Sequence, residues 1–229
     1  MTKPLKVNYV QHNGDCALLV FFKPHQHQPL RLQALAQYIR QEQVDGIVDV
    51  VPAVDSLMLV FDRPTEADDN IMAAVAEACR LSAAVDLKPQ THEISVCYDP
   101  EVAPDIKAVM SHTGLSLQDI ITTHSQPAYE ISFLGFLPGF AYLSGLPQSL
   151  HIPRKSSPTT RTPAGSIAIA NRQSGIYALN SPGGWHVIGR TPDSLVDWQS
   201  QQKMSYQPLD IIKFKPIDLA HYEHVCDDD

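Results

Sequence analysis

The chain lacks any long apolar run. Its longest near-apolar stretches, CALLVFF and SLMLVF, are far shorter than the roughly 20 residues that cross a bilayer. The first residues, MTKPLKVNYV, also lack the apolar segment and small-residue cleavage site of an export signal. With 44% hydrophobic and 18% charged residues, the composition is typical of an ordinary globular protein. We therefore expect a cytoplasmic protein without a membrane partner.

Cysteine is scarce and widely spaced. The sequence contains four cysteines: Cys16, Cys79, Cys97 and Cys226. They show no C-x-x-C or C-x-x-H spacing, which argues against a zinc site and favours reduced thiols. Among the ten histidines, His25 and His27 lie two residues apart, within KPHQHQP. This segment is more typical of a solvated loop than of a metal site, so we expect no bound metal.

Positive charge is also in short supply. The chain has 17 lysines and arginines against 25 aspartates and glutamates, for a formal net charge of -8. Because nucleic-acid binding depends on a basic surface, we expect no nucleic-acid partner. The sequence has no phosphate-binding loop, dinucleotide fingerprint or G-x-S-x-G elbow. It therefore predicts neither a nucleotide fold nor a self-contained hydrolase.

Glycine is unevenly distributed, which indicates two domains. Of the 11 glycines, only Gly14 and Gly46 precede residue 114. Strands are expected at 7–10, 16–22, 46–54 and 56–62, and helices at 29–43 and 71–85. This ββαββα order predicts a small α/β sandwich over residues 1–88. A linker at 86–91 would join it to a second domain over residues 89–229.

The second half consists mainly of short β-type runs. A helical period ends at Gly114, and Ser116 is placed to cap a following helix, LQDIITTH. Strands are expected at 92–98, 129–136, 140–146, 165–170, 175–179, 185–190 and 210–215. Such strands, separated by proline and glycine, are typical of a closed or nearly closed antiparallel barrel. The predicted fold class is therefore α+β.

The stretch FLGFLPGFAYLSGLP, residues 133–147, is a first candidate site. It spaces three glycines among Phe136, Phe140 and Tyr142. Glycine lets the backbone turn or approach a ligand, and the aromatic rings would then form a pocket rim. Alternatively, the rings belong to the barrel core and the glycines only make turns.

Two later stretches bring cations and glycines together. In 151–166, Arg154, Lys155 and Arg161 are suited to grip a carboxylate or phosphate, or else they belong to a solvated loop. In SPGGWHVIGRT, residues 181–191, paired glycines could form an anion-binding nest, or only an ordinary turn. The same stretch adds a hydroxyl, a stacking face and a guanidinium from Ser181, Trp185 and Arg190.

The motifs FLGFLPGFAYLSGLP, PAGSIAIANRQSGIYALNSPGGWHVIGRTP and HEISVCY resemble the family of the 5-oxoprolinase B subunit, also called the KipI or allophanate hydrolase subunit 1 family. The resemblance implies a cyclophilin-like barrel after the N-terminal domain. It implies an ATP-dependent 5-oxoprolinase that uses Mg²⁺ and shares its ATP contacts with a KipA-like, C-type partner, alongside a third, A-type partner. The alternatives that it leaves open are a KipI-like inhibitor of a sensor histidine kinase and a non-catalytic structural subunit.

The resemblance also implies a set of site residues and no metal ligand. The implied catalytic residues are His92, Arg154 and Arg190. The implied substrate-binding residues are Gly135, Pro138, Gly139, Phe140, Tyr142, Pro163, Gly165, Ser166, Gln173, Gly183, Gly184 and Trp185. The chain departs from the family pattern at Asp99, Pro100, Ala103, Thr159 and Asn171, where the family has glycines or an arginine. These departures leave the substrate open.

Overall fold

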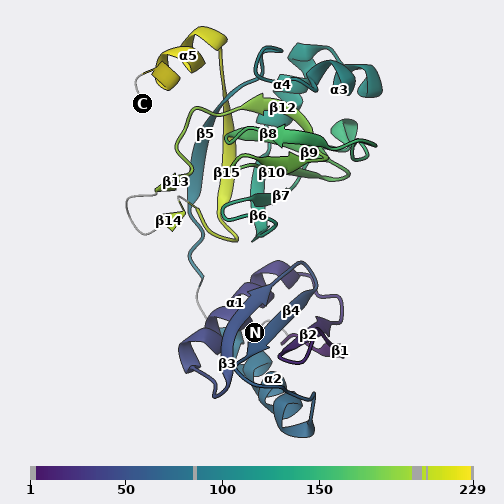
Figure 1. The fold of residues 1–229 in the computed structure, drawn as a ribbon, viewed down its shortest axis with the longest axis vertical. Coiled ribbons are helices and arrows are strands. Elements are labelled where there is room, and N and C mark those ends of the chain that lie inside the picture. The colour runs from purple at the N-terminus through teal and green to yellow at the C-terminus, as the bar shows by residue number, and fades with distance from the viewer. Residues whose placement is uncertain (1–3, 85–86, 198–202, 205, 228–229) are drawn as a thin grey trace. The chain divides into compact units, whose positions relative to one another are not determined.

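The chain forms two compact units, residues 1–88 and 89–229, in a computed structural model (Figure 1). The structure describes residues 4–84, 87–197, 203–204 and 206–227. Residue 85 of the expected second helix and residue 86 of the expected linker lie outside these ranges. Within the described part, no helix combines the length and apolarity needed to cross a bilayer.

The first unit is an antiparallel sheet with two helices. Its elements are β1 (Val7–His12), β2 (Ala17–Phe22), α1 (Gln28–Glu42), β3 (Ile47–Pro52), β4 (Ser56–Phe61), α2 (Asp69–Leu81) and the 3₁₀ turn η1 (Ser82–Ala84). The strand order is β1-β2-β4-β3. Alternate residues of β2 and β4 are buried with Leu32 and Leu35 of α1, as the period-2 pattern requires. Asp68 caps α2 by accepting a hydrogen bond from the Ile71 amide at 2.9 Å.

The second unit is built on a closed barrel. Its elements are β5 (Thr91–Cys97), α3 (Ile106–Thr113), α4 (Leu117–Ser125), β6 (Ala128–Leu134), β7 (Ala141–Ser144), η2 (Gln148–Leu150), β8 (Thr159–Thr162), β9 (Ser166–Ala170), β10 (Gln173–Ile176), β11 (Ser181–Gly183), β12 (His186–Arg190), β13 (Val196–Asp197), β14 (Lys203–Met204), β15 (Ile211–Ile217) and α5 (Leu219–Asp227). The barrel order is β10-β7-β6-β15-β5-β12-β9, and β8–β11 and β13–β14 are separate two-stranded ribbons. The expected α+β class is confirmed, and a capping box at Ser116 starts α4.

One strand pair corrects the expectation of an antiparallel barrel. β15 runs parallel to β5, from Ile211 opposite Thr91 to Ile217 opposite Cys97. The Ile211 amide donates to the Gln90 carbonyl at 2.8 Å, so the chain enters β15 at the end where β5 begins. Hydrophobic alternation marks a strand but carries no information about its direction, so the sequence could not show this pairing.

The barrel wall carries apolar side chains on both faces. Ile167, Ile169 and Ile176 belong to the cluster that fills the interior. On β9, Ala168 and Ala170 alternate with these isoleucines. They belong to a smaller cluster with Phe140, Tyr177, Trp185 and Val187. Because successive residues of a strand face opposite sides, this second cluster is an outer layer on the barrel wall.

A fully buried histidine ties the barrel interior together. The His124 Nδ1 lies 2.8 Å from the Tyr98 hydroxyl, and its Nε2 lies 2.9 Å from the Ser174 hydroxyl. The Tyr129 hydroxyl donates to the His124 carbonyl at 2.8 Å. Burial lowers the pKa of His124 to about 3, so the ring stays neutral in the folded protein.

This histidine should make stability depend on pH. The unfolded chain takes up the proton below a pKa of about 6.5, whereas the folded chain does so only near 3. Stability is therefore lost as the pH falls below about 6.5, by about 2 kcal/mol between pH 7 and pH 5. Urea unfolding at the two pH values measures the loss. His124→Gln should flatten the dependence, whereas His221→Gln, at an exposed position of α5, should preserve it. Equal slopes in all three proteins would contradict the assignment.

Candidate functional site

Four aromatic rings form a wall on the outside of the barrel. We call Phe140, Tyr142, Tyr177 and Trp185 the aromatic wall. The Phe140 ring centroid lies 4.8 Å from that of Tyr177 and 5.6 Å from that of Trp185. A Cβ at Gly175 would lie 2.9 Å from both the Phe140 and the Trp185 rings. Glycine on β10 therefore lets both rings pack directly against the strand.

Arg154 lies over the aromatic wall. Its guanidinium carbon is 5.9 Å from the Trp185 ring centroid, within cation–π range. Arg154 is exposed, and no acidic side chain of the described residues forms an ion pair with it. Burial raises the pKa of Tyr177 to about 12 and raises that of Tyr142, and the Arg154 charge opposes both shifts. The Arg154 charge therefore acts on both tyrosine hydroxyls.

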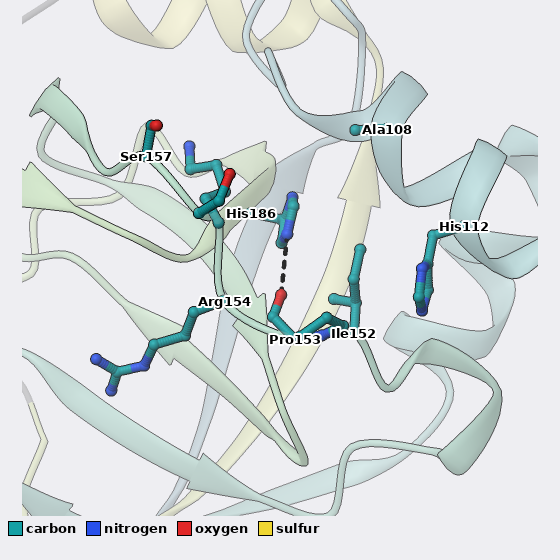
Figure 2. Close-up of a pocket in the computed structure, with 9 residues that line it drawn as sticks. Ala108, His112, Ile152, Pro153, Arg154, Ser157 and His186 are labelled. Carbon is teal, nitrogen blue, oxygen red and sulfur yellow. Dashed lines mark hydrogen bonds between the residues drawn. The ribbon is translucent and has the colours of Figure 1, made fainter.

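A cavity of about 490 Å³ adjoins Arg154 (Figure 2). It is lined by Ala108, His112, Ile152, Pro153, Arg154, Lys155, Ser156, Ser157 and His186. His186 Nε2 lies 3.1 Å from the Pro153 carbonyl oxygen, the dashed contact in Figure 2. The Arg154 side chain extends away from His112, which lies on the opposite side of the view. The cavity therefore has a mixed polar and apolar lining to which Arg154 contributes.

Lys155 has a structural role beside this cavity. Its Nζ lies 2.7 Å from Asp105 Oδ2 and 2.6 Å from Thr159 Oγ1. The same Asp105 oxygen accepts a hydrogen bond from the Val187 amide at 2.8 Å. Lys155 is thus held by a partner of opposite charge, whereas the Arg154 guanidinium remains available to a ligand.

The paired glycines do not form the expected nest. Neither Gly183 nor Gly184 has a positive φ, and a nest needs alternating right- and left-handed backbone. A Cβ at Gly183 would lie 2.5 Å from the Tyr177 hydroxyl and 2.8 Å from Thr162 Oγ1. At Gly184 the nearest atom would be 3.8 Å away, on Pro158. Gly183 therefore permits close packing in β11, and the nest interpretation is wrong.

The stretch 133–147 contributes both to packing and to a surface. Phe140 is buried in the outer layer, while Phe136 is 61% exposed with φ +69° and meets the Phe140 ring edge-on at 5.6 Å. Gly139, at φ +82°, turns the chain, and its carbonyl accepts from the Tyr206 hydroxyl at 2.9 Å. Gly135 and Pro138 lie in the same turn between β6 and β7.

Arg190 lies away from Arg154. Its Nε donates to the Ala164 carbonyl at 3.0 Å, and with Gly165 and Tyr222 it lines a different cavity of about 240 Å³. Pro163 and Ser166 flank this cavity in the sequence, since Ala164 and Gly165 line it. The expected residues 163–166 and Arg190 therefore gather at a second place on the barrel.

His92 and Gln173 lie elsewhere again. His92 Nε2 is 2.8 Å from Asp210 Oδ2 at the start of β5, whereas Arg190 is opposite Cys97 at the end of that strand. Five residues of strand separate the two positions by roughly 17 Å. Gln173 begins β10 opposite Ala170, beside the turn at 171–172. The structure thus does not bring His92 and the two arginines together.

Two residues of the site were not predicted from the sequence. Tyr177 belongs to the aromatic wall, and Gly175 makes room for it to form. A lone glycine inside a strand pattern signals a close approach of another group, and this signal was present in QSGI of β10.

Three departures from the family pattern are accommodated locally. Asn171 has φ +53°, a left-handed conformation that asparagine tolerates better than most residues. Thr159 binds the Lys155 ammonium group at 2.6 Å. Ala103 is fully buried, and its amide donates to the Asp99 carbonyl at 2.9 Å. The fold therefore persists at these positions.

The fold and site define a two-unit protein whose mixed barrel carries an aromatic wall on its outside, with Arg154 over Trp185. Residues 9–206 match the family model for the carboxyltransferase domain, subdomain C and D. The chain therefore belongs to this family.

Three relatives that share one name align with most of the chain. This chain is 30% identical over 226 residues to the 5-oxoprolinase B subunit of Bacillus subtilis strain 168, and the alignment covers 93% of this chain and 94% of the relative. It is 34% identical over 186 residues to the 5-oxoprolinase B subunit of Escherichia coli O157:H7, covering 81% and 84%. The Haemophilus influenzae protein of the same name is 35% identical, covering 82% and 86%.

Solved structures share the fold. TTHA0988 matches with a TM-score of 0.75 and 30% identity over 88% of this chain, which spans only 39% of that longer chain. The urea amidolyase of K. lactis matches with a TM-score of 0.77 over 98% of this chain and 16% of its own. At 16% identity, that likeness concerns the fold alone.

The paired glycines give a matched test of packing. Gly183→Ala should destabilise the protein by about 1–3 kcal/mol, because the added methyl overlaps two hydroxyl oxygens. Gly184→Ala has open space and should cost much less. Thermal and urea unfolding of the two variants measure the difference. Equal stability would mean that the Gly183 contact is not a tight one.

Proposed function

We propose that the protein is a subunit of an ATP-dependent 5-oxoprolinase of the cytoplasm, acting with a KipA-like, C-type partner and a third, A-type partner. The overall reaction converts 5-oxoproline, ATP and water to glutamate, ADP and phosphate. Relatives named as the B subunit of 5-oxoprolinase, at 30%, 34% and 35% identity, support this assignment. We do not expect this chain to be active alone.

The lactam bond makes the reaction difficult. Amide resonance stabilises the carbonyl of 5-oxoproline against attack by water, and phosphorylation of the carbonyl oxygen would provide a leaving group. When bound, ATP supplies that phosphoryl group. The contribution of the protein is to hold a small carboxylate and to balance negative charge.

The position of Arg154 above Trp185, without an acidic partner among the described residues, is the observation that carries the proposal. A guanidinium presents two parallel donors that match a carboxylate. We propose that Arg154 holds the carboxylate of 5-oxoproline, with the Tyr142 and Tyr177 hydroxyls beside it. The Trp185 face would then lie under the bound group. Arg190 lines a different cavity and His92 is paired with Asp210, so we assign neither residue to this contact.

The described residues fit an anionic group better than a metal ion. No cluster of three potential ligands from histidine, cysteine, aspartate and glutamate occurs among the residues that the structure describes. Asp105, the carboxylate beside the site, is already engaged by Lys155 and the Val187 amide. We therefore assign no Mg²⁺ ligand to this part of the chain and derive no step from the ion.

A regulatory role is the second candidate. The Phe136 side chain is 61% exposed, and its backbone has a positive φ. An exposed aromatic ring suits contact with another protein. A KipI-like protein would bind the dimerisation helices of a sensor histidine kinase and show no 5-oxoproline-dependent ATP turnover. Binding to such a kinase, measured beside ATP turnover, separates the two functions.

Arg154→Ala tests the catalytic proposal in the assembled complex. The chain is co-expressed with its C-type and A-type partners, and ATP hydrolysis is measured with and without 5-oxoproline. The variant should lower kcat/KM for 5-oxoproline by about 100-fold, the usual scale for losing one charge-stabilising group. Arg172→Ala, at an exposed position in the β9–β10 turn, is the control.

Two outcomes would contradict different parts of the proposal. Normal turnover by Arg154→Ala would remove that residue from the site. A wild-type complex that hydrolyses no ATP in response to 5-oxoproline would refute the function itself.

A further inference from the structure

Three buried hydroxyl groups of the barrel unit lack a hydrogen-bond partner among the described residues. Thr162, Ser166 and Ser181 are 1%, 1% and 7% exposed, and the hydroxyl oxygen of each is without a partner in that part of the chain. Most buried hydroxyls in proteins are paired, because leaving one unpaired costs free energy. Three in one part of the chain therefore require a physical explanation.

The three groups lie on neighbouring positions. Ser181 is directly opposite Thr162 in the β8–β11 ribbon, so their side chains share a face. Thr162 Oγ1 and the Tyr177 hydroxyl both lie within 3 Å of the position that a Gly183 Cβ would take. The Ser166 carbonyl accepts a hydrogen bond from the Tyr177 amide at 2.9 Å, which continues the β9–β10 ladder. We call Thr162, Ser166, Tyr177 and Ser181 the hydroxyl slot.

The ribbon that covers the slot is lightly built. Among the described strands, β8 and β11 pair only with each other, and their register shifts between Ser181 and Gly183. An isolated two-stranded ribbon has little stability of its own. The outward residues Thr160, Arg161 and Pro182 are exposed, so no other described element covers this face of the ribbon. A small opening would therefore give the slot access to a ligand.

We propose that the hydroxyl slot binds a small oxyanion, a carboxylate or a phosphate, beneath the β8–β11 ribbon when the ribbon lifts. Hydroxyl groups donate hydrogen bonds to anionic oxygens, and these bonds are stronger than those between neutral groups. Arg190, opposite Ser166 in the β9–β12 ladder, adds a cation near one end. The site shares Tyr177 with the proposed Arg154 contact, but its binding of an anion does not require the 5-oxoprolinase reaction.

Thr162→Val tests the slot because it keeps the shape and removes the unpaired hydroxyl. We expect the melting temperature of the full chain to stay the same or rise, since a buried unsatisfied group is lost. Calorimetric titration with inorganic phosphate, and separately with 5-oxoproline, should show at least tenfold weaker binding of the ligand that uses the slot. Thr160→Val, on the exposed face of the same strand, should bind like the wild type.

The two ligands separate the sources of the anion. Loss of phosphate binding alone assigns the slot to a phosphoryl group, and loss of 5-oxoproline binding alone assigns it to a carboxylate. Unchanged affinity of Thr162→Val for both ligands would overturn the proposal, as would a wild-type chain that binds neither. Ser181→Ala provides a second variant if Thr162→Val fails to fold. The titration does not depend on ATP turnover, so failure of the slot and failure of the proposed function remain distinguishable.

Discussion

The packing of Phe140 and Trp185 onto the bare backbone of Gly175 is the constraint on which the site depends. Large aliphatic residues of β9 and β10 fill the barrel interior, so the outward positions between them must be small enough to admit a second layer. A side chain at Gly175 would push both rings off the wall. The Trp185 face would then no longer support the Arg154 guanidinium. The position of Arg154 over Trp185 therefore follows from the absence of a side chain on a neighbouring strand.

Local sequence signals anticipated much of the fold. Alternation marked the barrel strands, and Ser116 caps α4 as its position predicted. The parallel β5–β15 pair was missed, because side-chain alternation is the same in both directions. The site was anticipated in part: Phe140, Tyr142 and Trp185 meet, but Arg190 does not join Arg154. Arg154 lies in the loop before β8, whereas Arg190 ends the barrel strand β12. The sequence pattern does not show where such a loop lies relative to the end of a strand.

The two layers of the barrel treat buried polar groups differently. In the interior, both ring nitrogens of His124 have hydroxyl partners, which favours a single rigid arrangement. In the outer region, the hydroxyls of Thr162, Ser166 and Ser181 have none among the residues that the structure describes. A satisfied network resists change, whereas an unsatisfied one gains free energy when a ligand supplies the missing bonds. We therefore expect the β8–β11 ribbon to adjust to a ligand more readily than the barrel interior around His124.

The overall charge also restricts which ligands the proposed Arg154 site can attract. With a formal net charge of -8, the protein as a whole repels anions, an effect that is screened beyond about 8 Å at physiological salt. Lys155 adds little attraction, because Asp105 neutralises it. The binding that we propose at Arg154 would therefore depend on the short-range geometry of the guanidinium and the two tyrosine hydroxyls. Such a site suits a small ligand that enters and fits, and it offers no long-range attraction to an extended polyanion.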